Sequence, residues 1–368
     1  MKISIQRDDL IKPLSYVAGI VEKRQTLPIL SNILIKCKED KIELTGTDLE
    51  VEIITTAVCE NDNGETTLPA RKLLDICRSL PSGSKITIEV KNEKAIVKSG
   101  RSRFSLMTMQ VADFPNLETS NWETELSLDQ TELKGLLERT QFCMAQQDVR
   151  YYLNGLLLEI EKDSIKTVAT DGHRMAISEI ALSDKNGKNI NPRQIIIPRK
   201  GVIELSRFLG DSDDAATIQI NPNHIRVTAG EICFTSKLID GRFPDYNKVI
   251  PSNQSKIISL EKEAFKETLQ RTAILSNEKY RGIRFEIKPK VMKVSAHNPE
   301  QEEAQEEIPI DYEGDEMEIG FNSNYIVDAV SALQTKEVEF ALSDANSSST
   351  ICSPGDKQTK YVVMPMRL

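Results

Sequence analysis

One pattern of residues occurs three times in the chain, at intervals of about a third of its length. The pattern is an apolar strand that ends in a short cap and continues into a helix, with copies at residues 66–74, 195–203 and 317–325. A second pattern, a short turn that closes a pair of strands, keeps the same spacing at residues 46–48, 169–172 and 296–298. Because two separate elements repeat at one spacing, and because this spacing is far longer than a solenoid unit, the sequence predicts three homologous domains in tandem.

Each third of the chain is predicted to hold the same elements. An amphipathic helix opens it, capped by Asp8 or Asp9 in the first copy and beginning near Asp129 and Glu261 in the others, with Pro13 expected in the first turn. A hairpin of alternating apolar and polar residues follows at residues 33–45, 156–168 and 283–295. A second helix follows the caps at Pro69, Pro198 and Phe321, and further strand pairs close each third. Two helices and about eight short strands per domain indicate the α+β class. We place the domains at residues 1–121, 127–249 and 251–368.

The composition limits the function classes. The net charge of −9 over 368 residues disfavours a diffuse nucleic-acid binder, although it leaves room for a local basic face. The six cysteines lie far apart and form no C-x-x-C pair, so we expect reduced thiols in a cytoplasmic chain and no metal site. The first ten residues lack the apolar core of a signal peptide, and no apolar run reaches the length of a membrane span.

The most enzyme-like string is Thr170-Asp171-Gly172-His173-Arg174-Met175. Asp171 and His173 could form a catalytic pair, a general base and the group that orients it. Alternatively, the string could simply be a turn between strands, in which Gly172 permits a left-handed backbone. The equivalent turns in the other two thirds do not contain this pair. The sequence also contains no P-loop, G-x-G-x-x-G or G-x-S-x-G motif. We therefore expect no catalytic residue, no metal and no cofactor, and keep a hydrolase or transferase that uses Asp171 and His173 as the alternative.

Two charged runs lie in the first and last thirds of the chain. Residues 300–307 are rich in glutamate, whereas residues 101–104 read Arg-Ser-Arg-Phe. Opposite charges in these positions predict head-to-tail docking of two chains, with Phe104 as an apolar anchor, although two unrelated surfaces or a site for a hard cation are alternatives. Basic residues also gather on the second helices of the first two thirds, which is typical of phosphate contact or of a solvated helix face.

Over its whole length the chain resembles the β subunits of bacterial DNA polymerase III, the sliding clamps. The strings that carry this resemblance are Thr45-Gly46-Thr47-Asp48-Leu49-Glu50, Gln147-Asp148-Val149-Arg150-Tyr151-Tyr152-Leu153-Asn154-Gly155, Ala169-Thr170-Asp171-Gly172-His173-Arg174, Asp240-Gly241-Arg242-Phe243-Pro244-Asp245-Tyr246 and Tyr361-Val362-Val363-Met364-Pro365-Met366-Arg367-Leu368. The resemblance implies three tandem clamp domains and a ring-shaped head-to-tail homodimer around double-stranded DNA. In the family this ring has no catalytic activity, holds the polymerase on its template and docks the clamp loader, other polymerases and repair proteins.

Helix dimensions agree with a ring of two chains. The family places two helices per domain on the inside. Six helices, each roughly 10 Å wide, leave a hole only about 10 Å across, whereas twelve leave a hole of about 30 Å. Because a B-form duplex is roughly 20 Å wide, one chain could not encircle DNA but two could.

The resemblance also implies three sets of site residues. Those expected at DNA are Arg24, Arg71, Arg78, Gln147, Tyr151, Tyr152, Arg199 and Lys200. Those expected in a pocket for a short linear motif of partner proteins are Leu153, Thr170, Gly172, His173, Arg174, Met175, Pro244, Lys248, Val249, Ser348, Val362, Met364, Pro365 and Met366. Those expected at the dimer interface are Lys72, Arg101, Arg103, Phe104, Ile274, Leu275, Glu300, Glu302, Glu303 and Glu306.

Two pocket positions depart from the family pattern, and one further interpretation stays open. Met175 stands where leucine is common, and Lys248 where arginine is common, so Lys248 lacks the bidentate fork of a guanidinium. An open, monomeric DNA-binding scaffold is the remaining alternative to the ring.

Overall fold

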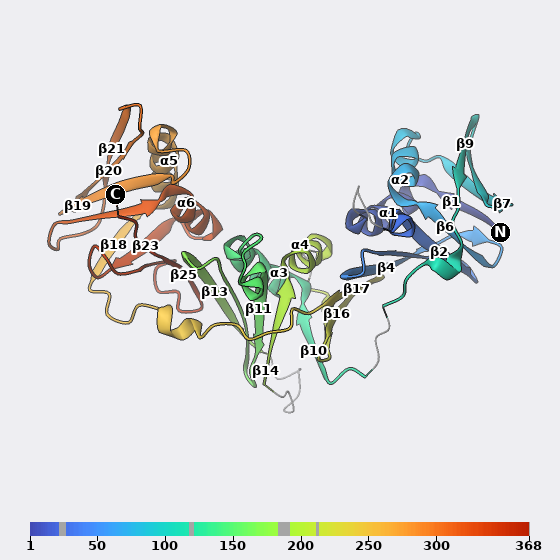
Figure 1. The fold of residues 1–368 in the computed structure, drawn as a ribbon, viewed down its shortest axis with the longest axis horizontal. Helices are drawn as coiled ribbons and strands as arrows, with labels where there is room; N and C mark the ends of the chain where they lie inside the picture. Colours follow the sequence, from blue (N-terminus) through green and yellow to red (C-terminus); the bar gives the residue numbers. More distant parts are fainter. Residues whose placement is uncertain (22–26, 118–120, 183–191, 211–212, 368) are drawn as a thin grey trace. The chain divides into compact units, whose positions relative to one another are not determined.

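The computed structural model describes residues 1–21, 27–117, 121–182, 192–210 and 213–367 (Figure 1). Within these ranges each third of the chain holds two α-helices among short antiparallel strands, as predicted from the repeat. Contacts between residues divide the chain into two compact units. Unit 1 comprises residues 1–133 and 200–238, and unit 2 comprises residues 134–199 and 239–368. The middle third therefore contributes residues to both units.

The elements of the first third belong to unit 1. The strands are β1 (Lys2–Gln6), β2 (Asn32–Lys38), β3 (Lys41–Thr47), β4 (Val51–Val58), β5 (Glu60–Asn61), β6 (Gly64–Pro69), β7 (Lys85–Lys91), β8 (Lys94–Ser99) and β9 (Ser102–Met107). The helices α1 (Arg7–Ile20) and α2 (Ala70–Ser79) lie beside each other (Figure 1). α1 buries Leu10, Leu14 and Val17, and it packs against β3 and β4.

The middle third contains the helices α3 (Gln130–Thr140) and α4 (Arg199–Phe208). Its strands are β10 (Thr124–Asp129), β11 (Gly155–Ile160), β12 (Ser164–Thr170), β13 (Arg174–Ala181), β14 (Arg193–Pro198), β15 (Ala215–Ile220), β16 (His224–Ala229) and β17 (Ile232–Lys237). The 3-10 helix η4 (Tyr151–Asn154) leads into β11.

The last third, in unit 2, contains α5 (Lys262–Thr272) and α6 (Ser323–Ala332), which also lie side by side (Figure 1). Its strands are β18 (Lys256–Glu261), β19 (Gly282–Lys288), β20 (Val291–His297), β21 (Glu303–Pro309), β22 (Met317–Asn322), β23 (Glu337–Leu342), β24 (Ser349–Cys352) and β25 (Thr359–Val363). Four buried phenylalanines, Phe265, Phe285, Phe321 and Phe340, pack ring against ring in its core.

Strand pairing joins the thirds within each unit. In unit 1, β17 pairs with β4, which gives an eight-stranded sheet in the order β10-β15-β16-β17-β4-β3-β2-β6 beside the five-stranded sheet β5-β1-β7-β8-β9. In unit 2, β25 pairs with β13, which gives the sheet β14-β11-β12-β13-β25-β24-β23-β18 beside the four-stranded sheet β21-β20-β19-β22. β9 and β21 are the strands equivalent to these joining strands, and each is an edge strand among the described residues.

Three local predictions at helix ends were wrong. α1 begins at Arg7 directly after β1, so Gln6 is its N-cap, and the Asp8 carboxylate instead accepts hydrogen bonds from Ser82 Oγ and Gly83 N. Pro13 lies inside α1 rather than in its first turn. The third copy of the cap is Asn322, not Phe321, because Gly282 pairs with Asn322 where Gly155 pairs with Pro198.

Two composition-based expectations can be compared with the structure. All six cysteines are free thiols, five of them buried. No helix in the described part of the chain is long and apolar enough to cross a membrane.

Candidate functional site

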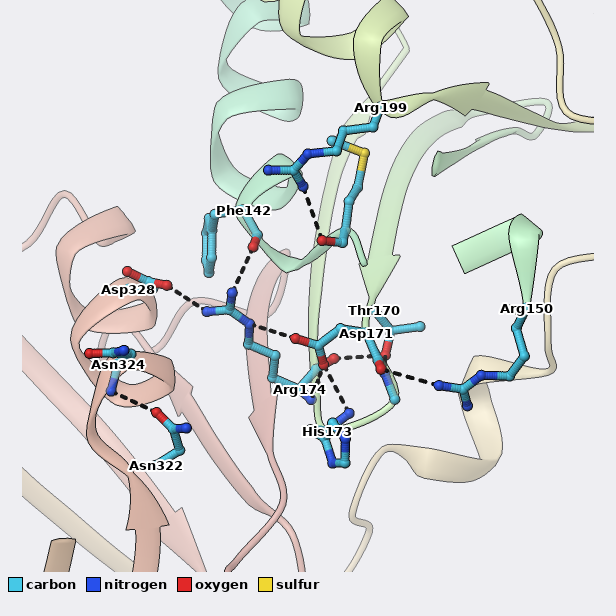
Figure 2. A network of polar contacts seen from close by, with 12 residues as sticks. Phe142, Arg150, Thr170, Asp171, His173, Arg174, Arg199, Asn322, Asn324 and Asp328 are labelled. Carbon is cyan, nitrogen blue, oxygen red and sulfur yellow. Dashed lines mark hydrogen bonds and ion pairs between the residues drawn. The ribbon is translucent and has the colours of Figure 1, made fainter. Parts of the chain in front are cut away.

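The Asp171–His173 pair forms a structural turn. Asp171 Oδ1 accepts hydrogen bonds from the backbone N–H groups of His173 and Arg174, at 2.9 and 3.0 Å, and Gly172 has a φ of +89° (Figure 2). Asp171 Oδ2 accepts a third hydrogen bond from Arg174 Nε at 3.1 Å. The carboxylate therefore stabilises the turn and positions the Arg174 side chain. In a catalytic pair the carboxylate would instead have to accept a hydrogen bond from the imidazole ring of His173.

Arg174 connects this turn to two other elements of unit 2. Its Nη1 donates to Asp328 Oδ2 on α6 at 2.6 Å, and its Nη2 donates to the Phe142 carbonyl at 2.8 Å (Figure 2). Its guanidinium carbon lies 4.6 Å from the centroid of the Tyr325 ring, and its side chain is only 13% exposed. A buried guanidinium with charged, carbonyl and aromatic partners fixes β13 against α6.

A pocket of about 310 Å³ opens beside this turn. Its floor is apolar: Leu153, Met175, Tyr246 and Val362 are buried members of one core cluster. Its rim carries Val249 and Met364, which are 47% and 44% exposed. An apolar floor with an exposed apolar rim suits a ligand that inserts hydrophobic side chains.

The chain's C-terminal segment forms one side of this pocket. β25 pairs with β13, and beyond it the Met364 N–H donates to the His173 carbonyl at 3.0 Å, while the Met366 N–H donates to the Gly320 carbonyl at 2.7 Å. Met364 is thereby held over the pocket, whereas Met366 is drawn toward β22.

The structure brings most of the expected pocket residues together. The lining contains Leu153, Thr170, Gly172, His173, Arg174, Met175, Pro244, Val249, Val362 and Met364. Lys248, Ser348, Pro365 and Met366 do not line it; Lys248 is 81% exposed and pairs with Asp245 at 3.1 Å.

Sequence reasoning missed two lining residues, Arg150 and Tyr246. Both lie within the strings that carry the family resemblance, which was the available signal. Arg150 binds Asp148 through Nε and Nη2, at 3.0 and 2.9 Å, and these hydrogen bonds lower the pKa of Asp148 to about 2. The Tyr246 hydroxyl donates to Glu159 Oε2 at 2.5 Å, and burial, followed by this carboxylate, raises the pKa of Tyr246.

In unit 1 a basic hollow of about 490 Å³ lies between α1, α2 and α4. Arg71, Arg78 and Arg207 line it together with Asp75. Arg207, 3.4 Å from Glu204, lies on α4 and is not among the residues expected at DNA. Three guanidinium groups around one hollow suit an anionic ligand.

Several residues expected at DNA make structural contacts. Arg71 donates to the Val21 carbonyl at 2.7 and 3.2 Å, Arg199 donates to the Met144 carbonyl at 3.0 Å, and Lys200 pairs with Asp48. Among the others, Arg78 and Gln147 are exposed, Tyr151 is 56% exposed, and Tyr152 packs against the pocket core, while Arg24 lies outside the described residues.

The residues expected at the dimer interface lie on β9 and β21, in the turns that precede these strands, in the 3-10 helix Ala273–Leu275 and, for Lys72, on α2. Phe104 is half-buried on β9, with Arg101 and Arg103 exposed around it, and Ile274 is 72% exposed. Lys72, Glu300, Glu302 and Glu303 are exposed and Leu275 is half-buried. Glu306 is held in its own domain by Arg271, at 2.6 Å, and that hydrogen bond lowers the pKa of Glu306.

Comparisons with known proteins cover the whole chain. The family models for the N-terminal, central and C-terminal domains of the DNA polymerase III beta subunit match residues 1–118, 127–245 and 247–367. The beta sliding clamps of Pseudomonas putida and Escherichia coli K12 are 49% and 47% identical, with 100% of each chain covered.

Solved structures agree with these matches. The Pseudomonas aeruginosa DNA polymerase III subunit beta superposes with a TM-score of 0.95 at 48% identity, and the Caulobacter crescentus pol III beta with 0.93 at 34%, each over 100% of both chains. The chain therefore belongs to the DNA polymerase III beta subunit family, the beta sliding clamps, and is a non-catalytic processivity subunit of a DNA polymerase holoenzyme.

Proposed function

We propose that two copies of this chain close head to tail into a ring around double-stranded DNA and tether the replicative polymerase in the cytoplasm. The observation that carries the proposal is the pair of edge strands β9 and β21. Their equivalents in the repeat, β17 with β4 and β25 with β13, pair within the chain. In a dimer, β9 of each copy could pair with β21 of the other copy. These two pairings between copies would close the ring.

The repeat also predicts the register of this pairing. Phe234 lies opposite Ile53 where β17 meets β4, and the equivalent residues are Phe104 and Ala304. In this register Arg103 lies opposite Gln305, between Glu303 and Glu307 on the same face of β21. The basic and acidic runs then face each other across the new strand pair.

Contacts with DNA are proposed to be few, basic and directed at phosphates. The hollow lined by Arg71, Arg78 and Arg207 lies on the helices, while the chain as a whole carries a net charge of −9. Such contacts bind without sequence preference, because phosphates carry no direct sequence information. Gln147 and Tyr151 could add hydrogen bonds or stacking from their exposed positions.

The pocket beside His173 is proposed to bind a short linear motif of the polymerase, the clamp loader and repair proteins. Its apolar floor and its volume of about 310 Å³ suit two hydrophobic side chains of an extended peptide such as Gln-Leu-Ser-Leu-Phe. A few such anchors give a binding free energy of about −8 kcal/mol, which corresponds to a micromolar dissociation constant.

Sedimentation velocity of a double variant tests the ring. Phe104→Ala with Leu275→Ala removes two apolar anchors, each expected to contribute about 2 kcal/mol, so monomer should appear at micromolar protein. The exposed pair Val58→Ala with Lys162→Ala, neither of which lies on β9 or β21, is the control and should stay dimeric. A Phe104/Leu275 variant that is wholly dimeric at nanomolar protein would contradict this interface.

A further inference from the structure

The threefold repeat creates three positions equivalent to the peptide pocket. Strand register defines them: Asn32, Gly155 and Gly282 pair with the helix caps Pro69, Pro198 and Asn322. Counting from these pairs, Leu153 of the pocket corresponds to Leu30 in the first third and to Tyr280 in the last. In the same way, Thr170 corresponds to Thr47 and His297.

In the first third the equivalent residues pack within an apolar cluster. Leu30, Leu34 and Phe114 form a buried cluster, and Leu49 and Val111 pack against it. Phe114 and Val111 belong to the segment that follows β9, which packs against Leu30 and Leu34.

In the last third the position is open. A hollow of about 400 Å³ is lined by Tyr280, Arg284, Ser295, His297, Met366 and Arg367, among others. The C-terminal segment runs along this hollow in the way that residues 239–244 run along the peptide pocket. The Met366 N–H donates to the Gly320 carbonyl, and at the equivalent position the Ile239 N–H donates to the Ile196 carbonyl. All these residues lie in unit 2.

The side chains make this third position chemically different from the peptide pocket. Tyr280, 54% exposed, replaces a buried leucine, and the Lys279 ammonium lies 5.1 Å from the centroid of its ring. Arg284 replaces the buried Leu157 and pairs with Glu318 at 3.0 Å. Arg367 and His297 are exposed at the rim. The hollow thus joins Tyr280 and Met366 to arginine and histidine side chains, in a chain that is acidic overall.

We propose that this hollow is a second docking site, which takes a short acidic peptide of a partner protein with one apolar residue anchored against Tyr280 and Met366. The inference rests on the proposed function only in treating the chain as a docking hub. Charge complementarity selects the ligand, because the exposed Arg367 guanidinium can bind a carboxylate in bidentate geometry and the Tyr280 ring receives the apolar anchor.

Ring closure would add a wall to the site. By register, the residue of β9 equivalent to Met364 is Met107, which is 59% exposed. When β9 of a second copy pairs with β21, Met107 of the partner subunit would lie beside the hollow as Met364 lies beside the peptide pocket. Dimeric protein should therefore bind the acidic peptide more tightly than the monomeric variant does.

An array of fluorescein-labelled peptides tests the proposal. Each probe is a hexaglutamate in which one position is replaced by Leu, Met, Phe or Tyr, with all-Glu and Lys-framed versions as references. Anisotropy is measured on full-length protein whose peptide pocket is first saturated with unlabelled Gln-Leu-Ser-Leu-Phe. At least one apolar-substituted acidic probe should bind with micromolar affinity, at least tenfold tighter than all-Glu and with no binding of the Lys-framed version.

Two variants locate the site. Tyr280→Ala and Arg367→Ala should each weaken the acidic probe at least fivefold and leave the affinity of the pentapeptide unchanged, whereas the exposed control Lys162→Ala should change neither. The proposal is overturned if no apolar-substituted probe exceeds the all-Glu peptide, or if both variants bind it like the parent protein. Failure of the pentapeptide itself would instead refute the proposed function of the first pocket.

Discussion

At the scale of single residues, the three equivalent turns hold different partners. The Asp48 carboxylate accepts hydrogen bonds from the N–H groups of Glu50 and Val51 and pairs with Lys200 of α4. Asp171 makes the same turn but binds Arg174. In the third copy Asn298 binds Glu302 within its own loop. The repeated turn was predictable from the sequence, but its partners were not, because Lys200 comes from α4 of the next third, whereas Arg174 and Glu302 lie within a few residues of Asp171 and Asn298.

Replacing Arg174 tests its role in holding β13 against α6. Arg174→Ala leaves Asp171, Asp328 and the Phe142 carbonyl without their donor, at an expected cost of about 2 kcal/mol or more. Calorimetry should show the melting temperature of unit 2 falling by about 4–8 °C. Lys248→Ala, which removes an exposed ion pair, is the control, with a change of about 1 kcal/mol or less. A melting temperature equal to the parent's in the Arg174 variant would show that the cluster does not stabilise unit 2.

Glu52 gives a pH-dependent prediction. It is 2% exposed on β4, and burial raises its pKa although the Leu117 backbone N–H opposes the shift. Because the folded pKa lies above the unfolded value of about 4.3, ionisation destabilises the folded protein, and stability is lost as pH rises through the folded pKa.

Glu52→Gln should therefore raise the melting temperature at pH 7 and give no gain below about pH 4, where the carboxyl is protonated in both states. Glu65→Gln, on the exposed part of β6, is the matched control and should change little at either pH. A lower melting temperature for Glu52→Gln at pH 7 would mean that the charged form is the stabilised one.

At the scale of elements, alternation and helical spacing predicted the hairpins and both helices of each third. The errors lie at helix starts. Side-chain preference suggested Asp8 as a cap, yet β1 runs directly into α1 and leaves Asp8 in the first turn. Asn322 was missed because the hydrophobic Phe321 matches the strand pattern before it. Such one-residue shifts depend on backbone pairing, which side-chain patterns do not encode.

The C-terminal segment gives a prediction at this scale. Deleting residues 364–368 removes the Met364 side of the pocket but leaves β25 and its pairing with β13 and β24. The truncated protein should fold and dimerise, and its affinity for Gln-Leu-Ser-Leu-Phe by calorimetry should fall at least tenfold, since one wall of apolar contacts is lost. Met109→Ala, an exposed methionine outside the pocket, is the control. Equal affinity of truncated and intact protein would place the partner site elsewhere.

At the scale of the whole molecule, the repeat and the resemblance predicted three domains, but not how strands join across them. The pairs β17–β4 and β25–β13 connect successive thirds through backbone hydrogen bonds. The side chains of these strands alternate like those of any other strand. The sequence pattern therefore did not predict which strands pair between successive thirds. Most of the lining of the pocket beside His173 was expected from the family resemblance, while Arg150 and Tyr246, which lie within the same strings, were missed.

The central claim is that the protein is held on DNA by topology rather than by tight contacts. The most direct measurement loads labelled protein onto a singly nicked plasmid with a clamp loader, isolates the complex at high salt, and then cuts the circle once with a restriction enzyme. High salt weakens phosphate contacts, so only a closed ring should remain bound. We predict retention on the circle and release within minutes of linearisation. Equal retention on the circle and on the linear product would contradict the account.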